Sequence, residues 1–137
     1  MTAIWAATVR LVIARAKGRC EYCRMHQSLQ GASFHVEHIV PRIVGGADDE
    51  TNLCLACPSC NLRKSSRTQG TDPESGTEVP LFHPRRDEWR EHFDWSDSTL
   101  SGLTPIGRGT IARLELNAPR RLLIREAEML FELFPPS

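Results

Sequence analysis

The sequence predicts an α+β fold in which a short two-stranded unit and a helix lie between flanking helices. Apolar residues recur at helical spacings near both ends of the 137-residue chain. Between them, residues 34–39 and 53–56 are short runs typical of strands, separated by a loop signal. Two Cys-x-x-Cys pairs bracket this unit. The chain length, with 40% hydrophobic and 25% charged residues, fits one globular domain.

The first helix is predicted over residues 3–17. Its apolar residues recur at spacings of three and four, and further apolar residues widen the stripe: Ile4, Ala7, Leu11 and Ala14, then Trp5, Val9 and Val12. This is the pattern of an amphipathic helix. Gly18 stands at the usual stop position, so the helix is expected to end there.

The central unit is predicted as strand, loop, strand and helix. Residues 34–39 form the first strand, which Pro41 stops. A Gly-Gly loop without periodicity follows. Residues 53–56 form the second strand. Pro58 is allowed in the first turn of a helix, which we expect to continue to Arg67.

The second half of the chain begins with residues 68–80, which have the composition of a linker. Trp89, Phe93 and Trp95 then indicate a short amphipathic turn that buries aromatic rings. Residues 105–116 are predicted to form a helix.

Thr104 is the expected N-cap of that helix. A last helix is predicted from Pro119 to Phe134, before Pro135-Pro136, with these apolar residues: Leu122, Leu123, Ala127, Leu130, Phe131 and Phe134. We therefore expect residues 1–67 to contain the first helix and the central unit. Residues 68–137 are expected to be a linker and a helical extension that pack as part of the same compact domain.

The cysteines indicate a structural zinc site. Cys20 and Cys23 form one pair and Cys57 and Cys60 the other, and thiolates two residues apart can bind one tetrahedral zinc ion. A two-stranded unit this small buries little apolar surface, so metal binding would contribute to folding. Cys54, between two leucines, is read as a small buried apolar residue. Two unrelated thiol pairs and a redox-sensing thiol protein are the alternatives.

Charge and hydropathy limit the class of partner. The net charge is zero, but residues 1–70 carry nine basic and five acidic residues, a formal +4, and residues 71–137 a formal −4. This asymmetry favours a polyanion facing the N-terminal half. No stretch approaches the roughly 20 apolar residues of a membrane span. No basic segment precedes the apolar start, so we expect no signal peptide, no membrane partner and a cytoplasmic location.

Between the cysteine pairs lies a Glu-His dipeptide with the residue types of a metal-dependent hydrolase. Alternate residues of a strand share a face, so His35 and Glu37 would point away from His38 unless the strand ends there, as Pro41 makes plausible. A carboxylate and an imidazole would then lie side by side. Asn61, at the start of the next helix, supplies a second oxygen.

These residues resemble the HNH endonuclease family, whose fold is the ββα-metal finger. The matching segments, within residues 18–67, are Glu37-His38-Ile39-Val40-Pro41, Gly45-Gly46, Asn52-Leu53 and Cys57-Pro58-Ser59-Cys60-Asn61-Leu62-Arg63-Lys64. Residues 80–117 also resemble the tail of small bacterial HNH proteins that zinc stabilises, and no mechanism follows from that tail.

The resemblance implies a metal-dependent endonuclease that hydrolyses DNA phosphodiester bonds, in which His38 is the general base. Glu37 and Asn61 would bind one Mg²⁺ or Mn²⁺ ion, Asn52 would fix the His38 ring by a hydrogen bond, and His35 is a further candidate ligand. The acid is Glu rather than the commoner Asp. The third signature residue is Asn61 rather than His, which favours hard ions.

The helix after the second cysteine pair carries Arg63, Lys64 and Arg67, which we expect to contact DNA phosphates. One such site cuts one strand, so the enzyme is expected to nick. A partner protein is a candidate for targeting this neutral chain to DNA. The alternative function is a non-catalytic zinc-ribbon module that binds nucleic acid or protein, which would have no need of the Glu-His pair and Asn61.

Overall fold

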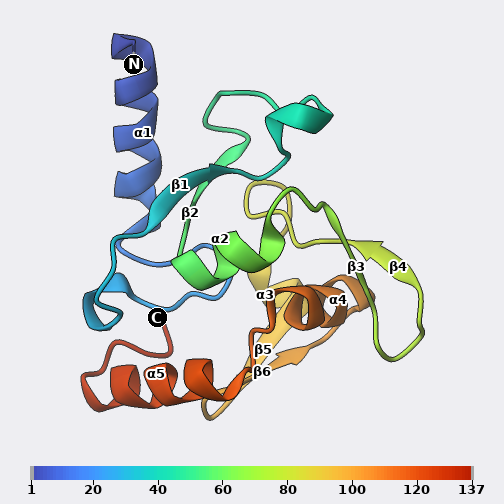
Figure 1. Ribbon diagram of the computed structural model, residues 1–137. Helices are drawn as coiled ribbons and strands as arrows, with labels where there is room; N and C mark the ends of the chain where they lie inside the picture. The colour runs from blue at the N-terminus through green and yellow to red at the C-terminus, as the bar shows by residue number, and fades with distance from the viewer. Residues whose placement is uncertain (1, 137) are drawn as a thin grey trace.

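The protein is a series of short helices and hairpins (Figure 1), and the computed structural model describes residues 2–136. In chain order the elements are α1 (Ala3–Ala16), η1 (Gln27–Leu29), β1 (His35–His38), η2 (Arg42–Val44), β2 (Leu53–Ala56), α2 (Pro58–Lys64), β3 (Gln69–Thr71), β4 (Glu78–Pro80), α3 (Trp89–His92), β5 (Phe93–Ser96), β6 (Thr99–Gly102), α4 (Pro105–Leu114) and α5 (Pro119–Leu130). Over the described residues the strands pair as three two-stranded antiparallel sheets. This mixture of helices and small sheets confirms the α+β class.

The helix α1 turns a different face to the protein than the predicted stripe. It ends at Ala16, and Lys17 takes a left-handed conformation with φ 54°. Ile4 and Leu11 of the stripe are 81% and 51% exposed, so this row of the prediction is wrong, whereas the residues predicted to widen the stripe face the protein. The helix contacts β1 and β2 along a neighbouring row with the same helical spacing, whose members are buried or half-buried: Trp5, Val9, Val12 and Ala16.

The predicted central strands are present. β1 pairs with β2 in a register that places Glu37 opposite Cys54, and each residue of β2 is buried. In the loop between them, Gly46 has no room for a side chain, since a Cβ would lie 1.7 Å from the Val40 carbonyl oxygen. The Gly-Gly loop is therefore folded tightly against the end of β1.

The helix α2 follows β2 directly. Pro58 lies in its first turn, as predicted, and Cys57 caps it by accepting the backbone N–H of Cys60 at 3.3 Å. The helix stops at Lys64 rather than Arg67, because the next residue takes a positive φ of 52°.

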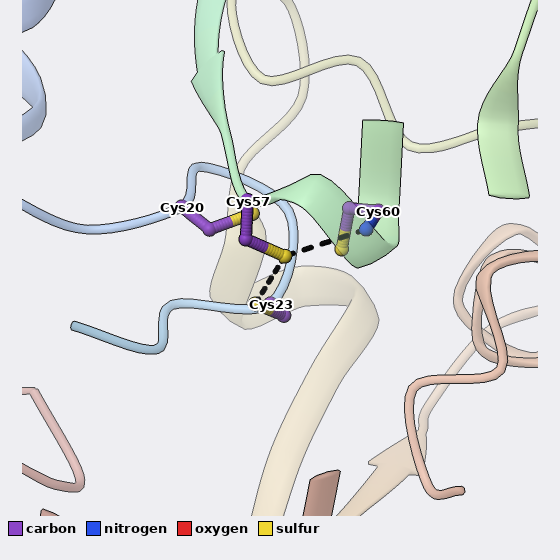
Figure 2. Close-up of side chains that lie close together, drawn as sticks. All are labelled: Cys20, Cys23, Cys57 and Cys60. Carbon is purple, nitrogen blue, oxygen red and sulfur yellow. Dashed lines mark hydrogen bonds between the residues drawn. The ribbon is translucent and has the colours of Figure 1, made fainter. Parts of the chain in front are cut away.

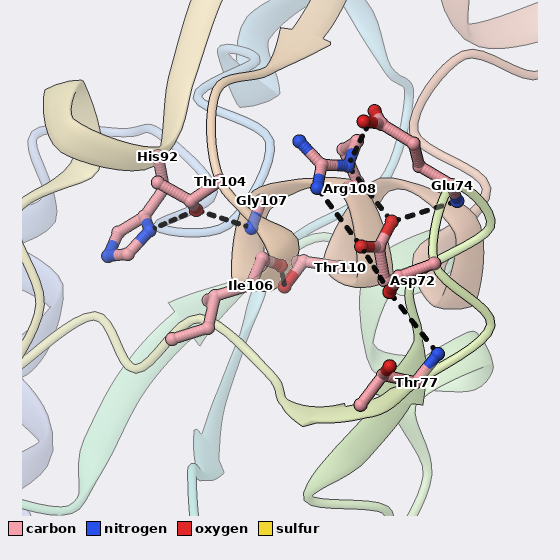
Figure 3. Close-up of polar contacts among 10 residues, drawn as sticks. Asp72, Glu74, Thr77, His92, Thr104, Ile106, Gly107, Arg108 and Thr110 are labelled. Carbon is pink, nitrogen blue, oxygen red and sulfur yellow. Dashed lines mark hydrogen bonds and ion pairs between the residues drawn. The ribbon is translucent and has the colours of Figure 1, made fainter.

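Residues 68–80, predicted as a linker, form the hairpin β3–β4, which packs on α4. The two elements approach closely: a Cβ on Gly70 would lie 2.8 Å from the Gly109 carbonyl oxygen. Asp72 ties the turn to α4 by accepting two hydrogen bonds from Arg108 at 2.9 and 3.0 Å (Figure 3). The composition predicted a linker and not paired strands. Strands of three residues carry too little alternation to be recognised.

The helix α4 begins as predicted. The Thr104 hydroxyl accepts the backbone N–H of Gly107 at 3.0 Å and hydrogen-bonds His92 Nδ1 at 2.6 Å, which anchors the N-terminus of α4 to α3 (Figure 3). The helix ends at Leu114, two residues before the predicted end.

The aromatic residues after the hairpin pack together, as the sequence indicated. The Trp89 and Trp95 rings lie 4.6 Å apart between centroids, and Trp95 meets Phe134 edge-on at 4.5 Å. Phe93 is 2% exposed. The segment is nevertheless one helical turn followed by the β5–β6 hairpin, which was not predicted.

The helix α5 differs from the prediction in where it ends and in which residues it buries, although Phe134, beyond its end, is buried. It ends at Leu130 rather than Phe134, and Leu123, Leu130 and Phe131 are exposed. Its buried residues are instead charged: Arg121, Arg125 and Glu128. The inner face of α5 meets backbone carbonyls and cysteine sulfurs, which need hydrogen-bond donors rather than apolar side chains.

The buried core draws on both halves of the chain. One cluster joins the four paired cysteines and Phe34 to residues of the second half such as Phe82, Leu114 and Phe134. Within the described residues, no helix is both long and apolar enough to cross a membrane.

Candidate active site and metal centre

The four paired cysteines meet in the interior, where the first knuckle, residues 20–23, lies beside the start of α2 (Figure 2). Their sulfur atoms all lie within 4.8 Å of one another, and Cys23 Sγ is 3.9 Å from Cys57 Sγ. Zinc–sulfur bonds of about 2.3 Å in a tetrahedron separate the sulfurs by about 3.8 Å. The cluster therefore has the ligand type, number and spacing of a structural zinc site.

Local backbone bonds shape the first knuckle. Cys20 N–H donates to the Met25 carbonyl at 3.0 Å, and Arg24 N–H donates to the Cys20 carbonyl at 2.8 Å. Glu21 ties the knuckle to β2 by accepting the Leu55 N–H at 2.8 Å. The pair at the start of α2 is therefore fixed relative to the first pair through β2.

The ionisation of the thiols fits a bound cation. Burial raises the pKa of Cys20 and of Cys60. Burial also opposes ionisation of Cys23, but hydrogen bonds from the other three cysteines outweigh it and lower the pKa of Cys23. Four ionised thiols this close together in the interior require a cation among them.

Arg121 of α5 lies against the cluster, although no pattern in the sequence indicated this position. Its Nη2 donates to Cys60 Sγ at 2.9 Å and lies 3.7 Å from Cys57 Sγ. Burial alone would lower the pKa of Arg121, but the negative charge of the nearby thiols raises it. The guanidinium is therefore a permanent positive charge beside the sulfurs.

A second set of polar residues lines an open hollow of about 270 Å³ at the end of β1. Its lining is formed by Glu37, His38, Pro41, Arg42, Asn61, Ser65 and Ser66. Because β1 ends at His38, the carboxylate and the imidazole both reach this hollow, and α2 contributes Asn61. A larger hollow of about 370 Å³ between α2 and α5 has no carboxylate or histidine in its lining.

Glu37 is the buried member of the hollow, 9% exposed. Burial raises the pKa of its carboxyl group, and the positive charge of Lys64 opposes the rise. Its Oε1 lies 3.9 Å from the sulfur of Cys54, which is buried, as the sequence predicted. A cation in the hollow would favour the charged form of this carboxylate and so oppose the effect of burial on its pKa.

Two residues that sequence reasoning missed hold His38. Its Nε2 lies 2.7 Å from Asp48 Oδ1, which also accepts a hydrogen bond from Arg42 at 2.7 Å. The Trp5 ring stacks on the imidazole with centroids 6.1 Å apart and an interplanar angle of 14°. Asp48 lies in a loop without periodicity, and Trp5 looked like an ordinary part of an apolar stripe. Neither position carried a recognisable signal.

Asn52 makes different hydrogen bonds from those predicted. Its amide donates to the carbonyls of Val40 and Ala47, both at 2.9 Å, and its oxygen accepts the Val40 N–H at 2.9 Å. The predicted bond to the His38 ring is therefore corrected, because the amide is fully used in closing the β1–β2 loop. Asp48, within that loop, bonds the ring instead.

The residues predicted to contact phosphates lie in different environments. Lys64 is 1% exposed with Nζ 3.5 Å from the His38 carbonyl, so the predicted contact with phosphates would require it to leave the interior. Arg63 forms an ion pair with Glu115. Arg67 is exposed beyond the end of α2.

His35, the further candidate ligand, is exposed at the start of β1. It does not line the hollow that contains Glu37, His38 and Asn61. The structure therefore does not group His35 with Glu37, His38 and Asn61.

Comparison with known proteins agrees with this arrangement. Comparisons with curated proteins and with solved structures give no match. Residues 20–67 match a family model described as HNH endonuclease, which suggests nuclease activity and a nucleic-acid substrate. The matched segment contains both cysteine pairs and the polar residues of the hollow. Over residues 20–67, the resemblance to the HNH endonuclease family is therefore confirmed.

Proposed function

We propose that the protein is a metal-dependent HNH-type endonuclease that hydrolyses DNA phosphodiester bonds and nicks one strand. In this proposal β1, β2 and α2 form the ββα-metal finger, and the four-cysteine cluster binds a structural zinc ion. One observation carries the proposal: Glu37, His38 and Asn61 line one open hollow beside a buried tetrathiol cluster.

His38 acts as the general base. Hydrogen bonds from Arg42 and then from His38 lower the pKa of Asp48, so Asp48 is a carboxylate at neutral pH. An ionised carboxylate can only accept, so the proton of the neutral ring must lie on Nε2. Nδ1 is then the free basic nitrogen, which takes a proton from the attacking water. Asp48 in turn stabilises the imidazolium that forms.

Glu37 and Asn61 would hold the catalytic divalent ion through their side-chain oxygens. Hard oxygen donors suit Mg²⁺ or Mn²⁺. When bound, such an ion neutralises charge on the scissile phosphate and on the leaving oxygen. The raised pKa of Glu37 does not prevent this role, because a bound cation stabilises the carboxylate.

The bound strand would lie across the basic N-terminal half of the chain. Arg67 is exposed and can contact phosphates without rearrangement, and Arg42 lines the hollow while its Nε donates to Asp48. Arg63 would first have to leave Glu115, an exposed pair that costs little to break.

A plasmid-nicking assay tests the proposal. Wild-type protein should convert supercoiled DNA to the nicked form with added Mg²⁺ and not without it. Substitution His38→Ala should slow nicking by about 10²–10⁴-fold, the usual contribution of a positioned base. His35→Ala is the matched control on the same strand and should nick at close to the wild-type rate.

Equal nicking by wild type and His38→Ala would reject catalysis by this hollow. Binding of DNA by a zinc-loaded wild-type protein that never cuts would favour the zinc-ribbon alternative instead.

A further inference from the structure

The helix α5 brings an arginine to the cysteine cluster from outside the segment that matches the HNH family. Arg121 follows the last paired cysteine, Cys60, by 61 positions in the chain. It is 4% exposed, and its Nη2 donates to Cys60 Sγ at 2.9 Å. The contact joins the C-terminal helix directly to a sulfur of the cluster.

The guanidinium is fixed by further hydrogen bonds. Its Nη1 donates to the Leu114 carbonyl at 3.1 Å and to the Ser59 hydroxyl at 3.2 Å, while Nη2 also faces Cys57 Sγ at 3.7 Å. The planar fork of an arginine therefore spans the end of α4 and the start of α2.

The positive charge of Arg121 would compensate part of the negative charge of a zinc tetrathiolate. Four thiolates and one Zn²⁺ carry a net charge of −2 in an interior where an uncompensated charge is costly. A hydrogen bond to a charged acceptor is among the stronger ones, and it favours the ionised form of the sulfur. Groups that hydrogen-bond to metal ligands commonly change metal affinity by 10–100-fold.

We propose that Arg121 is a part of the metal centre that raises its zinc affinity by stabilising the thiolates of Cys60 and Cys57. This inference rests on the structural zinc of the proposed function. It gives α5 a role in the metal centre, so the metal site extends across both halves of the chain.

Arg125, one turn further along α5, is the matched comparison. It is fully buried like Arg121 and also carries a guanidinium. Its hydrogen bonds go to oxygens, namely the Ser98 and Leu116 carbonyls and the Asn117 side chain. Loss of Arg125 therefore removes a buried positive charge that also acts on Cys23 and Cys60, without removing a hydrogen bond to sulfur.

The test measures zinc release from purified full-length protein. Wild type and the Arg121→Met and Arg125→Met variants are titrated with a chromogenic zinc chelator, after zinc content has been determined by elemental analysis. Methionine retains much of the side-chain volume while removing charge and donors. Arg121→Met should lower zinc affinity by about 10–100-fold. Arg125→Met and the exposed Arg120→Ala should stay within about threefold of wild type.

Thermal melts of the zinc-loaded proteins separate affinity from folding. Equal zinc affinity for Arg121→Met and wild type overturns the inference while leaving the zinc site intact. An equal loss of affinity for Arg121→Met and Arg125→Met also overturns it, since general destabilisation would then explain the effect. Wild-type protein without tightly bound zinc would refute the proposed zinc site itself. Partial recovery in Arg121→Lys would support the role of charge.

Discussion

Substituting one zinc ligand should destabilise the protein more than substituting the proposed catalytic base. The Cys57 side chain is 1% exposed within the core cluster and also caps α2. Structural zinc contributes about 10–16 kcal/mol of apparent binding free energy, or about 3–4 kcal/mol for each of four thiolates. Domains of ordinary size have about 5–15 kcal/mol of net stability. Cys57→Ser should therefore remove a large share of the free energy of unfolding.

The comparison variants should cost much less. His38→Ala removes one hydrogen bond to the exposed Asp48 and the stacking on Trp5, together about 1 kcal/mol. Cys54→Ala deletes a buried sulfur that is not one of the four clustered cysteines, which should cost about 1 kcal/mol through lost packing. Cys54 is the matched control, since it is as buried as Cys57.

Urea unfolding followed by tryptophan fluorescence provides the measurement. Trp89 Nε1 donates to the Tyr22 carbonyl at 3.1 Å, so this indole reports on the first cysteine knuckle. Cys57→Ser should lower the unfolding midpoint by several times the shift of Cys54→Ala, and a chelator should have little further effect on Cys57→Ser. Equal midpoints for Cys57→Ser and Cys54→Ala would refute a structural metal at this cluster.

Two further predictions concern carboxylates that accept from charged partners. Asp48→Asn should slow nicking about tenfold with little change in the Michaelis constant, because the ring of His38 loses its charged orienting partner, whereas Asp49→Asn should not; identical rates for the two variants would remove Asp48 from the mechanism. Hydrogen bonds from Arg108 hold the pKa of Asp72 well below its ordinary value, so the folded state binds this proton less readily than the unfolded chain. The stabilisation is present above that value and is lost as pH falls below it. Unfolding at pH 6 and at pH 3 should show a smaller acid loss for Asp72→Asn than for wild type, and an unchanged acid loss would contradict the assignment.

The central unit and the start of α4 could be predicted because their signals are local. The spacing of the cysteines, Pro58 at the start of α2 and the capping position of Thr104 depend on residues within a few positions of one another. The hollow was predictable for a related reason, since Glu37 and His38 are adjacent at the end of a strand. Features that depend on residues close together in the sequence can therefore be recognised from the sequence alone.

The errors occur where partners are distant in sequence. Arg121 and Arg125 of α5 face inward because sulfurs and carbonyls of other segments require hydrogen-bond donors. The sequence of α5 alone does not indicate these partners. The face of α1 was misjudged because two neighbouring rows of the helix are both apolar, and only contact with β1 and β2 selects between them. Lys64 appeared to belong to a basic helix face, but it is buried beneath β1.

The helix α2 connects the four-cysteine cluster to the hollow. Cys60 is followed immediately by Asn61, so the residue that would bind the catalytic ion is placed by the turn that the cluster fixes. Glu21, within the first knuckle, bonds Leu55 of β2, whose neighbour Cys54 pairs with Glu37. Loss of zinc should therefore displace both oxygen ligands of the hollow. His38, by contrast, bonds Asp48 and stacks on Trp5, so its substitution should leave the cluster in place. A nuclease built this way would lose activity on zinc removal, yet keep its zinc when its base is replaced.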